Sequence, residues 1–133
     1  MGNNSIGMIK HITFPLRFSL AVMIYLCCGL VSGQVESVAH RGASLSAPEN
    51  TLASTVKAIE LGVDRIEMDV RQSKDGVLVL MHDSRLERTT NGKGYLRDFT
   101  YEELRTLDAG SWFSKSYSGE RIPTLALILG LLA

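Results

Sequence analysis

The chain has 133 residues, 45% of them hydrophobic, and its 14 basic residues balance its 14 acidic residues to give no formal net charge at pH 7. This composition fits one ordinary globular domain, and the lack of a basic excess argues against nucleic acid as a partner. The charge is unevenly distributed, because Glu36 is the first acidic residue and the chain beyond residue 33 is slightly acidic.

The N-terminal segment is predicted to direct export. Lys10 and Arg17 precede an apolar run over residues 18–31, which ends in Val31-Ser32-Gly33. A positive region, an apolar region and small residues at the cleavage point are the three parts of a secretory signal peptide. We therefore interpret residues 1–33 as a signal peptide. A retained N-terminal membrane anchor is the alternative, although the run is shorter than the ~18 apolar residues of a span. Both place the rest of the chain outside the cytoplasm, either secreted, periplasmic or extracellular, or attached to the membrane.

The first half of the remaining chain has the order strand, helix, strand. Residues 35–40 form a strand candidate that runs into Arg41-Gly42, where glycine permits a sharp turn. A helix is expected from Asn50 or Thr51 to about residue 61, with Gly62 as its stop. Residues 63–70 then form the second strand. This order favours a parallel pair of strands joined by a crossover helix.

The second half begins with a turn at residues 74–76 and a third strand over the apolar run 77–81. Thr100 and Glu103 have the spacing of a capping box, which predicts a helix extending to about residue 110. Thr124 is expected to cap a last helix, but residues 125–133 contain no polar side chain. A surface helix should show a polar face, so this tail is either buried by something else or not the usual continuation of the domain.

Acidic and imidazole side chains are placed where the predicted strands end. Glu67 and Asp69 are two residues apart, so in a continuous strand they would point to the same face. Two neighbouring carboxylates need a cation, a proton or an arginine to be tolerated. His40 follows the first strand and His82 the third. In parallel α/β folds the carboxyl ends of the strands meet at one edge, where sites are built.

Several ordered motifs resemble the N-terminal portion of glycerophosphodiester phosphodiesterases. The similarity spans residues 38–125 and therefore most of the chain beyond the predicted signal. The motifs that carry it are His40-Arg41-Gly42, Pro48-Glu49-Asn50-Thr51, Glu67-Met68-Asp69-Val70, Asp75-Gly76-Val77, His82-Asp83, Arg88-Thr89-Thr90-Asn91-Gly92 and Ile122-Pro123-Thr124-Leu125.

The resemblance implies a TIM barrel that hydrolyses glycerophosphodiesters to glycerol 3-phosphate and an alcohol. It implies one divalent cation, Ca²⁺ or Mg²⁺, with Glu67 and Asp69 as ligands and Glu49 beside the metal. His40 and His82 would be the acid/base pair. Arg41 would bind the substrate phosphate, and pairing of Arg41 with a carboxylate such as Glu49 is the alternative.

The chain also departs from the family pattern. A (β/α)₈ barrel takes ~250 residues, and about 100 remain after the signal, so the expected architecture is an incomplete α/β barrel of about three strands. The family's third metal carboxylate and a phosphate-holding lysine would lie on a later strand, and residues 126–133 form an atypical apolar tail. We therefore expect residues 34–125 to be the N-terminal part of the catalytic domain, in a truncated product that does not turn over substrate on its own. The alternatives are a non-catalytic fragment or phosphoester- and metal-binding module, and a phospholipase D-like lipase on the same scaffold.

Overall fold

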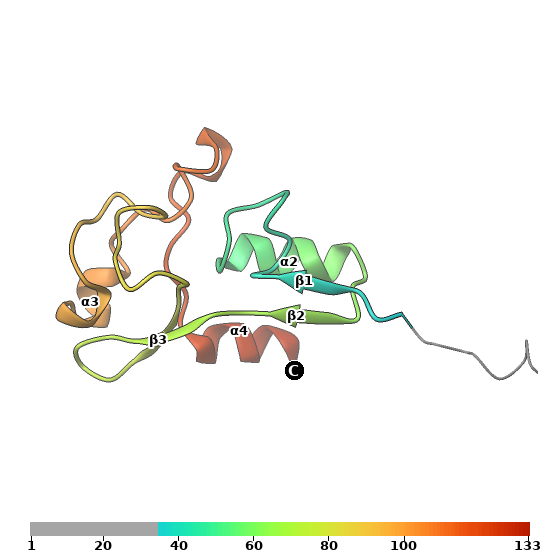
Figure 1. The fold of residues 1–133 in the computed structure, drawn as a ribbon, viewed down its shortest axis with the longest axis horizontal. Coiled ribbons are helices and arrows are strands. Elements are labelled where there is room, and N and C mark those ends of the chain that lie inside the picture. The colour runs from blue at the N-terminus through green and yellow to red at the C-terminus, as the bar shows by residue number, and fades with distance from the viewer. Residues whose placement is uncertain (1–34) are drawn as a thin grey trace, which may run out of the picture. The chain divides into compact units, whose positions relative to one another are not determined.

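The computed structural model describes residues 35–133, and the predicted signal peptide lies outside them. The first two strands lie side by side in Figure 1. β1 (Val38–His40) pairs in parallel with β2 (Arg65–Glu67), and His40 is the register partner of Glu67. The predicted parallel pair is therefore confirmed, and the ends of both strands bring two predicted site residues opposite each other.

Helix α2 (Leu52–Glu60) connects β1 to β2. Thr51 is its N-cap, because the Thr51 hydroxyl accepts a hydrogen bond from the backbone N–H of Ser54 at 3.2 Å. Leu61 is the C-cap of the helix, and Gly62 follows with a φ of +67°, a left-handed conformation that glycine adopts without strain. Ser54, Thr55 and Ala58 face the interior. Both predicted ends of this helix are correct to within about one residue.

The prediction of one continuous strand over residues 63–70 is wrong. β2 ends at Glu67, and a separate strand, β3 (Val70–Gln72), begins after Met68 and Asp69. The break occurs because the backbone N–H of Asp69 donates to the side-chain oxygen of Asn50 at 3.0 Å, instead of to a neighbouring strand.

The third predicted strand is β4 (Leu78–Leu80), and it runs antiparallel to β3. Its residues Val79 and Leu80, with Met81 after them, are buried, as the apolar run indicated. The expectation of a sheet of three parallel strands is wrong. The strands of residues 35–133 form two two-stranded sheets, β1-β2 and β3-β4, and no closed barrel.

A hydrophobic core lies between the antiparallel β3-β4 hairpin and the segments that follow it. Its buried members come from β4 and from the loops and short helices beyond: Val79, Met81, Leu86, Leu96, Leu104, Ala109 and Ile122. The short elements in this region are the 3₁₀ turns Leu96–Asp98 and Lys115–Tyr117 and the helix α3 (Tyr101–Leu104).

Helix α3 begins where the capping box predicted but is only four residues long. The Glu103 carboxylate accepts hydrogen bonds from the backbone N–H and the hydroxyl of Thr100, at 2.8 and 2.9 Å. The expected continuation to residue 110 is wrong. The backbone N–H of Asp108 is held by the side-chain oxygen of Asn91 at 2.9 Å, which draws the chain away from a helical path.

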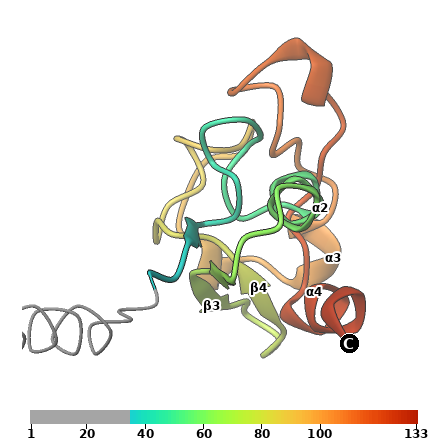
Figure 2. The same cartoon turned by 90° about the vertical axis from the view of Figure 1, so that its right-hand side faces the viewer.

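The last helix, α4 (Leu125–Leu132), begins at the predicted cap, where the Thr124 hydroxyl accepts from the N–H of Leu127 at 3.1 Å. The residues just before the helix lie alongside β4, since the N–H of Leu80 donates to the carbonyl of Pro123 at 3.0 Å. The helix lies close to β4 in Figure 2.

The surface of α4 is apolar. Ile128 is fully buried, whereas the four leucines at positions 127, 129, 131 and 132 are 44–56% exposed. No helix within residues 35–133 is long and apolar enough to cross a membrane.

Candidate active site

The turn after β1 places Arg41 at the centre of the candidate site. Arg41 has a φ of +59°, which is uncommon for a residue other than glycine, and Gly42 follows with +79°. The hydroxyl of Ser54 donates to the carbonyl of Arg41 at 3.2 Å, so α2 holds the turn from behind. Unusual backbone of this kind tends to be kept where a side chain must point in one direction.

Arg41 contacts three carboxylates. Its backbone N–H donates to Glu67 Oε2 at 3.1 Å, and its NH1 group donates to Glu49 Oε1 at 3.0 Å. Its Nε atom lies 3.2 Å from Asp69 Oδ2, at an angle that does not make a hydrogen bond. Arg41 is largely buried, with 19% of its side chain exposed, and Nε is a buried donor without a hydrogen-bond partner among the described residues. The alternative pairing of Arg41 with Glu49 is thus present.

Asn50 orients Asp69. Its side-chain Nδ2 donates to Asp69 Oδ2 at 2.9 Å, while its Oδ1 accepts from the Asp69 backbone N–H at 3.0 Å. Asn50 is buried and has a φ of +55°, so this second unusual backbone position contacts the same carboxylate as Arg41. By its place before α2, Asn50 is predicted only to cap a helix, whereas its position beside Glu49 in the family motif indicates another role.

The two histidines come from different strands, since His40 ends β1 and His82 follows β4. His40 Nε2 lies 3.9 Å from Glu67 Oε2, and both side chains are exposed. His82 follows β4, and its backbone carbonyl accepts from Arg71 Nε at 2.9 Å. The His82 ring nitrogen Nδ1 lies 2.6 Å from Asp83 Oδ1.

The antiparallel hairpin explains how His82 reaches this edge. Parallel strands were expected to carry it there, but β4 returns along β3 and ends opposite Asp69, whose carbonyl accepts from the N–H of Met81 at 2.9 Å. The N-terminal end of β3 is next to the C-terminal end of β2. Although β4 is antiparallel to β3, it therefore ends at the same edge as β2, where a parallel strand would also have ended.

Arg88 joins the His82 side of the site to the Arg41 side. It makes two hydrogen bonds to Asp83, from Nε to Oδ2 at 2.7 Å and from NH2 to Oδ1 at 3.0 Å. It makes two more to Glu49, from NH1 to Oε2 at 2.9 Å and from NH2 to Oε1 at 2.7 Å. The result is a continuous row of contacts from Arg41 through Glu49, Arg88 and Asp83 to His82.

These contacts keep the acidic groups charged. The Arg88 guanidinium, followed by the His82 ring, holds the pKa of Asp83 well below its usual range. Arg88 also lowers the pKa of Glu49, with Arg41 helping and burial opposing. In return, Glu49 and Asp83 raise the pKa of Arg88. Glu49, Asp83 and Arg88 are therefore all ionised at neutral pH.

The charge of the site fits a divalent cation, while the number of ligands is incomplete. Two guanidinium groups face the four carboxylates of Glu49, Glu67, Asp69 and Asp83, which leaves two negative charges in excess when the histidines are neutral. Carboxylate oxygens are the donors that Ca²⁺ and Mg²⁺ prefer. However, within residues 35–133 no group of three or more His, Cys, Asp or Glu side chains is arranged to hold a metal ion.

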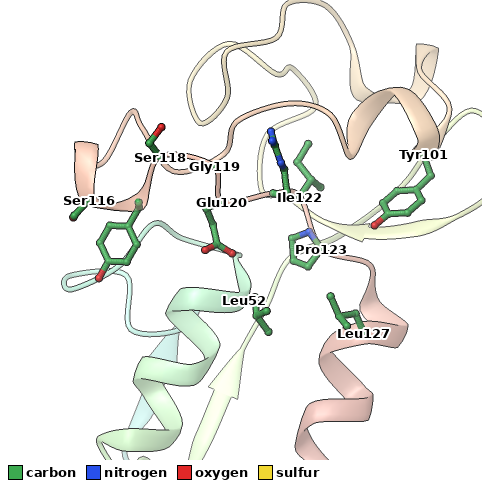
Figure 3. A pocket seen from close by; sticks show the side chains of 11 residues that line it. Leu52, Tyr101, Ser116, Ser118, Gly119, Glu120, Ile122, Pro123 and Leu127 are labelled. Atoms are coloured by element: carbon green, nitrogen blue, oxygen red, sulfur yellow. The ribbon is translucent and has the colours of Figure 1, made fainter.

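Two hollows differ in their relation to these residues. A cavity of about 10 Å³, room for about one water molecule, is lined by residues that include Glu49, Asn50 and His82. A larger hollow of about 450 Å³ lies between the start of α2, residues 116–123 and the first turn of α4, as Figure 3 shows. The predicted site residues do not line that larger hollow.

All six predicted site residues are therefore linked by contacts at one edge of β1 and β2. His40 and Glu67 lie at the strand ends, Arg41 and Glu49 on the loop before α2, Asp69 between β2 and β3, and His82 after β4. Sequence reasoning missed the bridging position of Arg88 and the ring contact of Asp83. Both belong to motifs that were noted, but residues 49 and 88 are too far apart in sequence for their contact to be inferred.

A comparison with known protein families matches residues 40–131 to the model of the glycerophosphoryl diester phosphodiesterase family. A glycerophosphodiester phosphodiesterase of Caldanaerobacter subterraneus is 53% identical over 95 residues, which cover 71% of this chain and 39% of that protein.

Solved structures of similar proteins give the same result. A glycerophosphodiester phosphodiesterase from Agrobacterium tumefaciens is 46% identical with a TM-score of 0.72, and the match covers 74% of this chain and 43% of that one. A phosphodiesterase from Oleispira antarctica, solved in complex with the product sn-glycerol-3-phosphate, is 45% identical with a TM-score of 0.72, over 74% of this chain and 40% of that one. The chain thus spans about two fifths of the length of the proteins it matches.

Proposed function

The chain belongs to the glycerophosphoryl diester phosphodiesterase family, and on this premise we propose that its residues 40–131 carry part of an active site that hydrolyses glycerophosphodiesters to glycerol 3-phosphate and an alcohol. The observation that carries the proposal is the row of contacts that links all six predicted site residues through Arg41 and Arg88. The product named for the Oleispira antarctica structure supports the substrate class.

Arg41 is proposed to bind the substrate phosphate. A guanidinium group can grip two phosphate oxygens at once, and the Nε donor of Arg41 is buried without a hydrogen-bond partner among the described residues. Glu49 and Asp69 hold the side chain in place, which lowers the entropy lost on binding.

His40 and His82 are proposed to exchange the protons of the reaction. One imidazole takes a proton from the attacking hydroxyl, and the other donates a proton to the leaving oxygen. Such acid/base assistance typically contributes ~10²–10⁴-fold to the rate. His40 and His82 are both accessible to a substrate, with 68% and 45% of their side chains exposed.

Glu67 and Asp69 are proposed to hold one divalent cation, Ca²⁺ or Mg²⁺, with Glu49 nearby. When bound, the cation supplies Lewis-acid stabilisation of charge on the phosphoryl oxygens. The excess of two carboxylates over guanidinium groups supports a cation at this edge. Asn50 would keep Asp69 oriented toward it through their paired hydrogen bonds.

The test combines cation binding by the full chain with turnover by a form that continues through the later barrel strands. In that longer form, release of glycerol 3-phosphate from glycerophosphocholine is expected to stop with a chelator and to return when Ca²⁺ or Mg²⁺ is added. The double variant Glu67→Gln with Asp69→Asn should abolish both this activity and cation binding measured by calorimetry. The control is Asp98→Asn with Glu102→Gln, which removes two carboxylates that lie away from the site and are more exposed than Glu67 and Asp69.

Retained, cation-dependent activity in the double variant would contradict the metal assignment. A second candidate function, cation or phosphoester binding without turnover, is favoured by the incomplete ligand set within residues 35–133. Cation binding without product release from glycerophosphocholine, in the longer form as well as in this chain, would select this candidate. Release of product only from intact lysophospholipids would select the lipase alternative.

The location of the protein follows from residues 1–33, which lie outside the described part. We propose that they export the remaining chain or anchor it to a membrane, as their charge and hydropathy pattern predicts. A fusion of residues 1–33 to a reporter enzyme should appear outside the cytoplasm, and retention of the reporter inside the cell would contradict the proposal.

A further inference from the structure

The contact between His82 and Asp83 determines which ring nitrogen carries the proton. Nδ1 of His82 lies 2.6 Å from Oδ1 of Asp83. An ionised carboxylate only accepts hydrogen bonds, and Arg88 together with His82 keeps the pKa of Asp83 far below neutrality. The Nδ1 atom must therefore be the donor, and a neutral His82 ring has its lone pair on Nε2.

Arg88 holds Asp83 in the position that this bond requires. Its guanidinium donates to both oxygens of Asp83, at 2.7 and 3.0 Å, and to both oxygens of Glu49, at 2.9 and 2.7 Å. A guanidinium group presents its donors as a rigid fork, so two bidentate contacts fix the carboxylates relative to each other. Only 13% of the Glu49 side chain is exposed, which gives the fork a buried point of attachment.

The main chain of His82 is fixed independently. Arg71 donates to the His82 carbonyl, and the neighbouring N–H of Met81 donates to the carbonyl of Asp69 at 2.9 Å. With its backbone held by β3 and its Nδ1 held by Asp83, the ring has little freedom left to rotate. The remaining nitrogen, Nε2, is the one available to a substrate.

We propose that Arg88 is a positioning residue that, through Asp83, holds His82 in the tautomer with the proton on Nδ1 and Nε2 free for proton exchange. The same guanidinium ties this ring to Glu49 and hence to Arg41, so that the proton-exchanging nitrogen and the phosphate-binding side chain keep one geometry. The inference rests on the proposed function, because it assigns Arg88 a purpose in the same reaction.

The test is ¹⁵N NMR of the histidine rings in the full chain, at a pH where the rings are neutral. Long-range proton–nitrogen correlations distinguish a protonated Nδ1 from a protonated Nε2. For wild-type His82 we expect the Nδ1–H form to exceed the other by about tenfold or more, the ratio that a charge-assisted hydrogen bond sustains. His40, which has no carboxylate within hydrogen-bond distance of Nδ1 among the described residues, serves as an internal reference.

Two variants test the route through Arg88. Arg88→Lys keeps the charge but cannot form both bidentate contacts, and Asp83→Asn offers the ring a donor as well as an acceptor. Each should give a mixture of His82 tautomers. The matched control is Arg85→Lys, because Arg85 is a neighbouring arginine that pairs with Glu87 instead.

A wild-type ring with its proton on Nε2 would overturn the proposal, and so would an unchanged tautomer ratio in both Arg88→Lys and Asp83→Asn. In an active preparation, Arg88→Lys should lower kcat by roughly 10²-fold, the lower end of acid/base contributions, with KM changed far less. Absence of turnover in the wild type would count against the proposed function, whereas the tautomer measurement would still decide the role of Arg88.

Discussion

Replacement of Gly42 by alanine tests how the turn that carries Arg41 is built. An added Cβ at this position would lie 2.5 Å from the Ser54 hydroxyl oxygen, 2.7 Å from the Ser54 Cβ and 2.8 Å from its backbone carbonyl carbon. The last of these atoms belongs to the main chain of α2 and cannot turn aside. Gly42 also has a φ of +79°, where an alanine is strained whatever the space.

Two costs therefore add at Gly42. The left-handed backbone costs an alanine about 1–2 kcal/mol, and forcing a methyl group into a packed site costs about 1–3 kcal/mol more. We expect Gly42→Ala to lower the free energy of unfolding by about 2–5 kcal/mol, a large share of the ~5–15 kcal/mol of a typical domain. Because the displaced turn contains Arg41, phosphate binding should weaken as well.

The assay is urea unfolding of the full chain followed by circular dichroism. Gly62→Ala is the matched control, since Gly62 has a similar φ of +67° and an added Cβ would meet no atom within 4 Å. The free energy of unfolding of Gly62→Ala should fall only by the cost of the left-handed backbone, about 1–2 kcal/mol. Equal losses in the two variants, to within about 0.5 kcal/mol, would show that β1 and α2 do not approach as closely as described and would refute the reasoning.

Three further predictions concern charge, the second unusual backbone position and the apolar helix. The lowered pKa of Glu49, caused mainly by Arg88, means that its ionised form stabilises the fold above the usual carboxyl pKa of ~4.3; this stability should be lost as the pH falls through the lower folded value. Glu49→Gln should flatten that acid dependence of the urea midpoint. Asn50→Asp should destabilise the chain by about 1–3 kcal/mol, since it replaces the donor to Asp69 by a second carboxylate. Leu129→Glu should reduce self-association in sedimentation experiments with little change in stability, because Leu129 is 56% exposed on an apolar helix.

Each of these has a clear contrary result. An acid dependence that is identical in the wild type and in Glu49→Gln would show that Glu49 is not held by arginine in solution. An Asn50→Asp variant as stable as the wild type would contradict the paired hydrogen bonds with Asp69. Unchanged association of Leu129→Glu would mean that the exposed face of α4 does not mediate contacts between chains.

Local signals predicted the elements well where neighbouring residues decide them. The cap at Thr51, the stop at Gly62, the capping box at Thr100 and the cap at Thr124 are all present. They fail where a distant side chain competes for the backbone. Asn50 interrupts the strand at Asp69, and Asn91 captures the N–H of Asp108 beyond α3. No residue near either break signals it in the sequence.

The candidate site shows the same division. The residue types at the strand ends, together with the family resemblance, predicted six candidate site residues, and the motifs predicted the family correctly. The reason given for their convergence was partly wrong, because His82 arrives on an antiparallel strand. In the bridge from Glu49 to Asp83, Glu49 and Arg88 are 39 positions apart in the sequence, and nothing in their spacing indicates the contact.

By itself the sequence determined which groups are available, namely two imidazoles, an arginine after a strand and three carboxylates in motifs of one family, because such motifs are local. Only the tertiary structure decided which partner each group has. Arg41 lies among Glu49, Glu67 and Asp69, and Arg88 binds two carboxylates at once. The physical reason is that an ion pair depends on distance and direction in space, and the turn at Arg41 and the return of β4 set both through contacts between remote segments.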